Sequence, residues 1–429
     1  MSDILADTVI GAYRLAGRAA VPLMPIALSW RARRGKEDRA RLGERFGRAS
    51  KPRPAGRLVW VHAASVGETN AIMPLVERIT RRGFSVVFTS VTLTSADIAA
   101  QRLPRGACHQ FAPIDAPPLI GRFLDHWRPD LALFVESELW PTTIVRLAAT
   151  GIPQVLVNAR LSERSFRGWR RLGGVARAIF GRIPLCLAQS AQDAERYAAL
   201  GVPRLEVIGN LKFDAPPPEV DAKILEGFCA AVADRPVWVA ASTHAGEEAI
   251  VAEAHSLLRA RFDRLLTIIV PRHPERGDAI RSELAARGLR TVQRSRSEKF
   301  DDTTQVYIAD TLGELGLFYR VAPIAFLGGS LISHGGQNPI EPVRLGSAVL
   351  HGPNVHNFSD IYATIDGVDG APPIADAADL ADAVTRFLED PEARRCFADK
   401  TADALAPLGG ALAATMAALD PYLAGDHAK

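Results

Sequence analysis

Short runs of Val, Ile and Leu alternate with helix-length segments along almost the whole chain, and this alternation limits the fold more than any other feature. The runs predict strands at residues 58–62, 86–89, 131–135, 154–157, 185–188 and 205–208, and then at 237–241, 265–270, 306–309, 323–327 and 348–350. Continuous apolar runs separated by helices are typical of parallel sheets that are covered on both faces. The sequence therefore predicts an α/β fold with doubly wound parallel sheets.

A proline-rich segment divides this alternation into two series of similar length. Residues 214–221 read Asp-Ala-Pro-Pro-Pro-Glu-Val-Asp, and three consecutive prolines make a stiff connector. A chain of 429 residues is long enough for two domains, at roughly 100–200 residues each. We expect two doubly wound domains, at residues 51–213 and 222–408, with a cleft between them and a final helix within 409–429.

Composition excludes several classes of protein. The 51 Lys and Arg against 48 Asp and Glu leave a net charge of +3, too small to indicate nucleic-acid binding. The four cysteines form no C-x-x-C pair, which disfavours a disulfide framework and a cysteine-based zinc site and favours a reducing, cytoplasmic compartment. No G-x-G-x-x-G follows the first strand and no P-loop motif occurs, so a dehydrogenase or a P-loop enzyme is disfavoured. The ten histidines are scattered, and no metal site is predicted.

The first 50 residues have the pattern of a membrane-associated segment. Arg14 and Arg18 lie opposite an apolar stripe at helical spacing, formed by Leu5, Val9, Ala12, Ala16 and Ala20. An apolar stretch follows at 19–30, and then ten basic residues stand against three acidic ones between residues 31 and 53. This order suits a helix lying on an anionic membrane surface; the alternative is a helix packed on its own domain with its charged face in solvent. The two arginines favour surface attachment over a tilted single pass.

In the first half, residues able to do chemistry stand where strands end. Glu68 follows the first strand in the pattern Ser-Val-Gly-Glu, which is also the spacing of a capping box. Glu136 and Glu138 follow a later strand, and their period of two points them to opposite faces, so that one can enter the cleft. The alternative for both is a helix N-terminus. Lys212 closes this half, where it could meet an anion or pair with the neighbouring aspartate.

In the second half, three segments at strand ends could bind a nucleotide. Arg272 follows the strand at 265–270, where it could contact a nucleotide or stabilise its own loop. Thr311 and Glu314 have the spacing of a second capping box. The segment Gly-Gly-Gln-Asn-Pro-Ile-Glu at 335–341 is a glycine-rich loop that opens a helix. Backbone N–H groups at such a point can hold phosphate, and a carboxylate one turn in can accept from ribose hydroxyls.

Seven motifs at the ends of predicted strands, five of them described above, follow one another over nearly the whole chain. Together they resemble the 3-deoxy-D-manno-octulosonic acid (Kdo) transferases of lipopolysaccharide biosynthesis: His-Ala-Ala-Ser-Val-Gly-Glu68, Glu136-Ser-Glu-Leu-Trp-Pro, Asn158-Ala-Arg-Leu-Ser, Gly-Asn-Leu-Lys212-Phe, Ser-Thr-His244-Ala-Gly-Glu, Val-Pro-Arg272-His-Pro-Glu-Arg and Gly335-Gly-Gln-Asn-Pro-Ile-Glu341. One departure is Gln337, where many relatives carry His, and we expect it to tune the loop without removing its function.

The resemblance implies a glycosyltransferase of the B type, with an acceptor-binding domain at 51–213, a CMP-sugar-binding domain at 222–408 and a last helix, in 409–429, that returns to the first domain. It implies CMP-Kdo as donor, a lipid A precursor (lipid IV-A) as acceptor, and no cofactor. The expected place is the cytoplasmic side of a cell inner membrane, with an anionic membrane surface as partner through residues 1–50 and no nucleic acid.

The resemblance also implies roles for single residues. Glu68 would be the general base that takes the proton from the acceptor hydroxyl in an inverting transfer, and Glu136 and Lys212 would stabilise the transition state. CMP would be bound by Pro271, Arg272, Leu312, Gly313, Glu314, Asn338, Pro339, Ile340 and Glu341.

Two alternative functions remain. One is a glycosyltransferase of the same fold that uses a UDP-sugar, which competition by CMP or UDP would separate. The other is a non-catalytic lipid-A-binding membrane protein, against which the joint presence of Glu68, Lys212, Arg272 and Glu341 argues, because a binding module needs no base.

Overall fold

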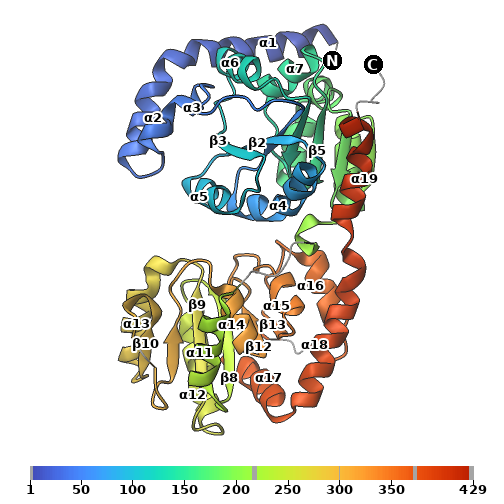
Figure 1. Ribbon diagram of the computed structural model, residues 1–429. Coiled ribbons are helices and arrows are strands. Elements are labelled where there is room, and N and C mark those ends of the chain that lie inside the picture. Colours follow the sequence, from blue (N-terminus) through green and yellow to red (C-terminus); the bar gives the residue numbers. More distant parts are fainter. Residues whose placement is uncertain (1–2, 215–219, 299, 371–373, 425–429) are drawn as a thin grey trace. The chain divides into compact units, whose positions relative to one another are not determined.

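The computed structural model describes residues 3–214, 220–298, 300–370 and 374–424 of the chain, and it divides into two compact units (Figure 1). The first unit comprises residues 1–215 and 408–429, and the second comprises 216–407. Residues 215–219 of the expected linker lie outside the described residues. Each unit is built on one parallel sheet, which confirms the predicted fold class of two doubly wound α/β domains.

The first unit contains a seven-stranded sheet in the order β3-β2-β1-β4-β5-β6-β7. Its strands are β1 (Leu58–His62), β2 (Ser85–Ser90), β3 (Ala107–Phe111), β4 (Leu131–Val135), β5 (Gln154–Ala159), β6 (Leu185–Ala188) and β7 (Leu205–Val207). Its helices are α1 (Asp3–Ala20), α2 (Met24–Arg33), α3 (Leu42–Arg45), α4 (Val66–Arg81), α5 (Leu93–Arg102), α6 (Pro117–Trp127), α7 (Pro141–Ala149), α8 (Glu163–Arg171), α9 (Gly174–Phe180), α10 (Ala191–Leu200) and α19 (Ala411–Ala424), with a short 3-10 turn η3 (Leu211–Phe213).

The second unit contains a six-stranded sheet in the order β10-β11-β9-β8-β12-β13. Its strands are β8 (Val237–Thr243), β9 (Leu266–Pro271), β10 (Thr291–Gln293), β11 (Val306–Ile308), β12 (Ile324–Leu327) and β13 (Ala348–His351). Its helices are α11 (Ala222–Val232), α12 (Glu247–Arg259), α13 (Gly277–Ala286), α14 (Leu315–Val321), α15 (Ile340–Arg344), α16 (Ser359–Asp366), α17 (Ala377–Glu389) and α18 (Pro391–Leu405).

Both faces of the first sheet are covered, as its continuous apolar strands require. Along β1, Val59 and Val61 point into a core shared with α4 and α19, whereas Leu58 and Trp60 point into a second core shared with α1, α6 and α9. All five residues of β1 are buried. This alternation leaves only the ends of the strands free to carry polar groups for chemistry.

The sequence did not predict two strands, β3 and β10. Each is the outermost strand of its sheet, and each has a weak apolar pattern, Ala-Cys-His-Gln-Phe and Thr-Val-Gln. An edge strand has a neighbour on one side only and needs less apolar surface, so its sequence signal is weaker.

Helix α1 packs on the first unit, but not through the stripe that its sequence marks as apolar. Ala6 and Ile10 are buried in the core beside α6 and α9, and Figure 1 shows α1 beside α6. The expected stripe instead faces outward, since Leu5 and Val9 are 46% and 42% exposed. The prediction of a helix packed on its own domain is thus correct for one face, while an apolar face is left in solvent.

The exposed apolar surface continues beyond α1. The large apolar side chains exposed in the first 30 residues, called here the N-terminal apolar residues, are Leu5, Val9, Tyr13, Leu15, Leu23, Ile26 and Trp30. Exposed apolar side chains concentrated on adjoining helices are typical of a surface that meets a membrane or a partner.

Part of the basic run that follows α2 is used inside the unit. Arg45 is 5% exposed and donates to the carboxylate of Glu37 at 3.0 Å and to two backbone carbonyls, those of Val91 and Ala112. Arg41 pairs with Glu44 at 2.8 Å. Only the exposed members, among them Arg33, Arg34, Lys36, Arg39, Arg48 and Lys51, remain available to an anionic surface.

The C-terminal helix α19 is a core element of the first unit. Leu412, Met416 and Leu419 are buried in the same core as α4, and Asp214 accepts hydrogen bonds from the N–H groups of Gly410 and Leu412 where the helix begins. By length and composition, the helix over Pro391–Ala424 could cross a membrane, and 39% of its apolar window is buried in the protein. The burial of α19 explains its apolar composition without a bilayer.

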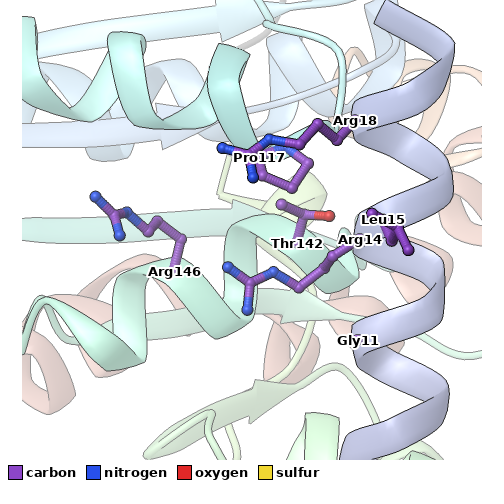
Figure 2. A pocket seen from close by; sticks show the side chains of 7 residues that line it. All are labelled: Gly11, Arg14, Leu15, Arg18, Pro117, Thr142 and Arg146. Carbon is purple, nitrogen blue, oxygen red and sulfur yellow. The ribbon is translucent and has the colours of Figure 1, made fainter.

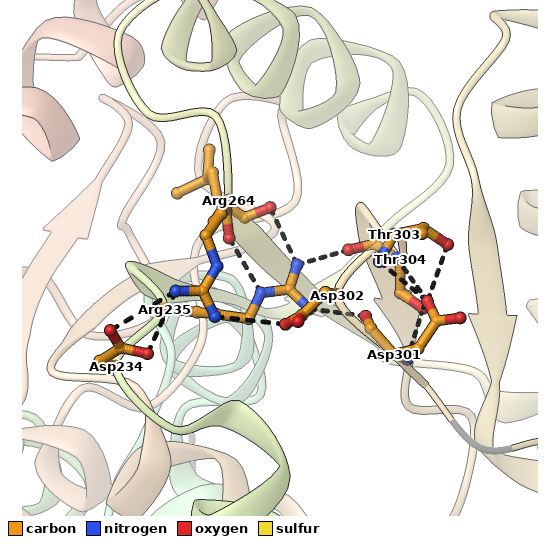
Figure 3. Close-up of polar contacts among 8 residues, drawn as sticks. Asp234, Arg235, Arg264, Asp301, Asp302, Thr303 and Thr304 are labelled. Carbon is orange, nitrogen blue, oxygen red and sulfur yellow. Dashed lines mark hydrogen bonds and ion pairs between the residues drawn. The ribbon is translucent and has the colours of Figure 1, made fainter.

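In the second unit, a buried arginine organises the loops that lead into the sheet (Figure 3). Arg235, immediately before β8, is 4% exposed and donates to the carbonyls of Arg264, Asp301 and Thr304. These carbonyls belong to the segments that enter β9 and β11. The fork of five donors on one guanidinium is what allows a single side chain to hold several loops.

Candidate active site

Glu68 stands in the first turn of α4, just beyond the end of β1. Its backbone N–H donates to the Ser65 hydroxyl at 3.3 Å, and that hydroxyl donates to Oε1 of Glu68 at 2.8 Å. Oε2 accepts from the N–H of Ala64, also at 2.8 Å. The Ser65 half of the predicted capping box is therefore present, and the carboxylate bonds the Ser65 hydroxyl and the N–H of Ala64 instead of the N–H of Ser65. These bonds fix the carboxylate at the carboxyl edge of the sheet.

The surroundings of Glu68 make its carboxylate a stronger base than an exposed one. The side chain is 8% exposed, and this burial raises its pKa above the ordinary 4.5. The hydrogen bonds from Ser65 and Ala64 lower the pKa, and the negative charges of Glu136 and Glu138 raise it further. Burial is the largest of these effects and decides the direction.

Glu136 and Lys212 form an ion pair in the same unit. Nζ of Lys212 donates to Oε1 of Glu136 at 2.9 Å, and both side chains are about one-fifth exposed (21% and 20%). Glu136 follows β4 with φ of +56°, a left-handed conformation that only Gly, Asn and Asp adopt readily. Asn210, which accepts from the N–H of Lys212, holds η3 in place. Lys212 therefore pairs with Glu136 rather than with Asp214.

Glu138 has a different set of partners. Its Oε2 accepts from the indole N–H of Trp140 at 3.0 Å and lies 3.4 Å from Nε2 of His62. The carboxylate that caps α7 is Asp115, which accepts from the N–H groups of Thr142 and Thr143. The interpretation of Glu136 and Glu138 as helix caps is thus wrong, because a residue far away in the sequence performs that role.

In the second unit, Glu247 organises the glycine-rich segment after β12. Its carboxylate is fully buried (0% exposed) and accepts four backbone N–H groups, from His244, Gly329, Ser330 and Leu331. The carboxylate thus supplies hydrogen-bond acceptors to backbone N–H groups of the loop that have no partner in a neighbouring strand. The sequence motif contains Glu247, but nothing in its spacing indicates that it reaches a segment more than 80 residues away.

Arg272 and Arg276 follow β9 and have different environments. Arg272 is exposed, and its backbone N–H donates to the carbonyl of Thr243 at 2.9 Å. Arg276 forms a bidentate pair with the fully buried Glu248, at 2.7 and 3.0 Å. The loop-stabilising role that was the alternative for Arg272 therefore belongs to Arg276, and the Arg272 guanidinium is left at the surface, beside Pro271 at the end of the strand.

Residues 312–314 follow β11, the neighbour of β9 in the sheet. Leu312 is 74% exposed and Gly313 has φ of +82°. Glu314 binds the guanidinium of Arg294 and the hydroxyl of Thr311, and the hydrogen bond from Arg294 lowers the pKa of its carboxyl. No side chain caps the first turn of α14. The expected capping box is therefore absent there, and Thr311 bonds the carboxylate instead.

The segment 335–341 lies after β12. Gly335 and Gly336 have φ of +101° and +75°, as the tight turn requires. Oδ1 of Asn338 accepts from the N–H of Ile340 at 3.1 Å, Pro339 precedes α15, and Glu341 lies in its first turn. The three segments predicted to bind CMP, at 271–272, 312–314 and 338–341, thus share the carboxyl edge of one parallel sheet, where ligands of such sheets bind.

His244 adds a feature beside this loop that sequence reasoning did not weigh. Its ring lies 3.8 Å from that of His334 and its Nε2 is 3.1 Å from Nε2 of Gln337. Burial, together with the charges of His334, His273 and Arg272, lowers its pKa to about 4. The imidazole is therefore neutral at physiological pH, and Gln337 is a direct neighbour of it.

Among the described residues, no group of three or more His, Cys, Asp or Glu side chains is placed to hold a metal ion. The cationic groups at the predicted site are those of Lys212 and Arg272.

The architecture places the protein in a structural class. A glycosyltransferase structure from Rickettsia africae is similar over 86% of this chain and 99% of its own, with a TM-score of 0.57 and 13% sequence identity. At that identity the likeness shows the fold alone, which is the pair of Rossmann-like domains of the glycosyltransferase B type.

The sequence comparisons identify the family. Residues 40–215 match the family model described as 3-deoxy-D-manno-octulosonic-acid transferase. The 3-deoxy-D-manno-octulosonic acid transferase of Haemophilus influenzae is 37% identical over 394 residues, 90% of this chain and 92% of its own length. That of Bordetella pertussis is 35% identical over 427 residues, 96% and 99% of the two chains. The chain belongs to the 3-deoxy-D-manno-octulosonic acid (Kdo) transferase family and is a glycosyltransferase.

Proposed function

We propose that the protein transfers Kdo from CMP-Kdo to a lipid A precursor, lipid IV-A, with inversion at the anomeric carbon, and that Glu68 is the general base. The observation that carries this proposal is the buried carboxylate of Glu68, with its raised pKa, at the carboxyl edge of the first sheet. A sugar hydroxyl is too weak an acid to be ionised at neutral pH, so it needs such a base within hydrogen-bond reach.

The transfer exchanges one bond at the anomeric carbon. The acceptor oxygen forms a bond to that carbon while the bond to the phosphate oxygen of CMP breaks, and Glu68 takes the hydroxyl proton. CMP departs with the bonding electron pair, so negative charge grows on its phosphate. The ammonium group of Lys212 would offset that charge or the carboxylate of Kdo, and Glu136 would steady the positive charge that develops on the sugar ring.

The donor is assigned to the second unit. The exposed guanidinium of Arg272 suits a phosphate, and Glu341, in the first turn of α15, suits ribose hydroxyls. Pro271, Leu312, Gly313, Glu314, Asn338, Pro339 and Ile340 complete the expected CMP-binding set. This assignment follows from the motif match and from the shared sheet edge.

The acceptor is a lipid, and we assign the enzyme to the cytoplasmic side of the inner membrane. The outward apolar face of α1 and α2 and the exposed part of the basic run support attachment to an anionic surface. Burial of Ala6 and Ile10 in the first unit favours surface attachment over a span by α1.

The test is a reaction with pure full-length protein, CMP-Kdo and lipid IV-A, with the products weighed by mass spectrometry. We expect one or more Kdo additions, inhibition by CMP and little inhibition by UDP. Absence of any Kdo adduct, or competition by UDP rather than CMP, would overturn the proposal. The anomeric configuration of the product, read by NMR, tests inversion separately.

A further inference from the structure

A surface cavity of about 400 Å³ lies in the first unit, between α1 and the first turns of α6 and α7 (Figure 2). Arg14 and Arg18 from α1 and Arg146 from α7 line it, together with Leu15 and Thr142. Figure 2 shows the side chains of Arg14 and Arg18 extending from α1 toward α6 and α7, with that of Arg146 on the far side. We call this the arginine cavity.

The three guanidinium groups lack the counter-charges that arginines usually acquire. Within the described part of the chain, none of them forms a hydrogen bond or an ion pair through its side chain, and Nε of both Arg14 and Arg146 is buried without a partner. Burying a cationic N–H group with no acceptor is costly, and three positive charges around one cavity also repel each other. Binding of an anion in the cavity would therefore be favourable.

Two carboxylates of the same region bond other groups. Asp115 accepts from the N–H groups of Thr142 and Thr143 and from the Tyr13 hydroxyl, at 2.9, 2.8 and 3.2 Å. Asp7, earlier on α1, lies 3.7 Å from Arg182. Among the described residues, neither carboxylate forms an ion pair with the three arginines that line the cavity.

The chemistry of the lining selects among anions. Planar guanidinium groups present several donors in a fixed fork, which matches the oxygens of a phosphate group. Leu15 lines the cavity and is 68% exposed, and it is one of the N-terminal apolar residues on α1 and α2. A ligand that is phosphate at one end and apolar at the other satisfies both parts of this surface.

We propose that the arginine cavity binds the phosphate group of a membrane lipid, while the N-terminal apolar residues contact its acyl region. This inference rests on the proposal that α1 and α2 meet a membrane, and it assigns a defined site, separate from Glu68 and from the CMP-binding segments. It also gives a role to Arg14 and Arg18, whose side chains form no hydrogen bond or ion pair among the described residues.

The test measures binding of a short-chain, water-soluble phosphatidylglycerol to the full-length protein by calorimetry. The cavity variant is R14Q/R146Q, and the matched control is R105Q/R290Q, which removes the same charge from exposed arginines outside the cavity. We expect the cavity variant to bind the lipid about tenfold or more weakly, and the control to bind like the parent. Equal binding by the parent and the cavity variant would overturn the proposal, as would a parent that does not bind.

Two further arms identify the source of the phosphate. Inorganic phosphate tests a free anion; if it binds as tightly as the lipid, the site is not a lipid site. Hexanoate tests a carboxylate on an apolar chain. If it binds as tightly as the phospholipid, the site is not specific for phosphate. Transfer of Kdo to a detergent-dispersed acceptor is measured in parallel. This measurement tests the proposed reaction independently of the proposed lipid site.

If the arginines served only to stabilise the fold, replacing them would lower the melting temperature. The proposed lipid site predicts no such loss. Because neither side chain has a hydrogen-bond or ion-pair partner among the residues that the structure describes, we expect the melting temperature of R14Q/R146Q to equal or exceed that of the parent. The variant R14K/R146K, which keeps the charge without the planar fork, should recover part of the lipid affinity. A lowered melting temperature with unchanged lipid binding would show that these residues serve the fold.

Discussion

At the scale of single residues, the cap that Glu68 forms and its proposed role as the base are compatible. Its backbone N–H and carboxylate complete the cap of α4, and the same hydrogen bonds hold the carboxylate in one orientation. Each carboxylate oxygen accepts one hydrogen bond from the protein and can accept another. The cap therefore does not compete with the proposed catalytic role, since it would position the base.

Replacing Glu68 with Gln tests the base directly. Gln is similar in size but cannot take a proton, so we expect turnover to fall about 10²–10⁴-fold, while CMP binding by calorimetry stays at the parent level. The matched control is Glu77→Gln, the same substitution at a side chain of the same helix that is 44% exposed, and it should leave turnover unchanged. Turnover of folded E68Q near that of the parent would leave Glu68 with the capping role alone.

The pH dependence of turnover follows from the environment of the same carboxylate. Burial raises the pKa of Glu68, and only the ionised form accepts the proton, so activity is lost as the pH falls through that raised pKa. Glu138 is one of the charges that raise it, so Glu138→Gln should move the acid limb of kcat/KM to lower pH. An acid limb that does not move, in a variant with normal stability, would mean that another group titrates.

At the scale of elements, the glycine-rich loop of the second unit depends on Glu247. We expect Glu247→Gln to cost about 1.5–3 kcal/mol for each charged hydrogen bond that is lost, because an amide has one acceptor oxygen where the carboxylate has two, and to weaken CMP binding. Glu253→Gln, on an exposed position of the same helix, is the control and should change neither. Urea unfolding and CMP calorimetry measure the two effects. Normal CMP affinity in E247Q would show that the loop does not contribute to nucleotide binding.

The N-terminal helices allow a membrane test that does not disturb the core. Leu23 and Ile26 are 66% and 71% exposed, so L23E/I26E should change stability by about 0.5 kcal/mol at most and should greatly reduce flotation with anionic vesicles. The control I224E/L257E alters two exposed apolar positions of the second unit and should float like the parent.

Deletion of residues 1–30 is a less specific test, because it also removes Ala6 and Ile10 from the core. Flotation of L23E/I26E equal to that of the parent would show that a membrane is met through a different surface.

Strands with a continuous apolar run were the predictable ones. The strands β1, β4 and β6 have the predicted bounds, and each consists of buried residues throughout. The strands β3 and β10 were missed because their sequences, Ala-Cys-His-Gln-Phe and Thr-Val-Gln, lack such a run.

At the scale of the whole molecule, the proposed roles divide between the two units, with the base in the first and the nucleotide in the second. Arg272→Ala should weaken CMP binding and leave both stability and acceptor binding near parent levels, because its side chain is exposed. Arg276→Ala is the contrasting variant: it leaves the fully buried Glu248 unpaired and should cost about 3–5 kcal/mol of stability. CMP affinity of R272A equal to that of the parent would show that the nucleotide is bound elsewhere.

The sequence alone determined the class of the fold, the family and the candidate residues. Buried parallel strands demand continuous Val, Ile and Leu, and this demand is visible as a pattern whatever the final arrangement. The motifs at strand ends marked Glu68, Glu136, Lys212 and Arg272, because polar groups for chemistry concentrate where strands end.

Only the tertiary structure decided which of these groups meet. The pair between Glu136 and Lys212, the four N–H groups on Glu247 and the capping of α7 by Asp115 all join residues distant in the chain. Helix α1 shows the same limit: it has two apolar faces, and periodicity cannot tell which one packs. Contacts with other elements bury Ala6 and Ile10 and turn Leu5 and Val9 outward, because spacing along one helix records its own faces and not what lies against them.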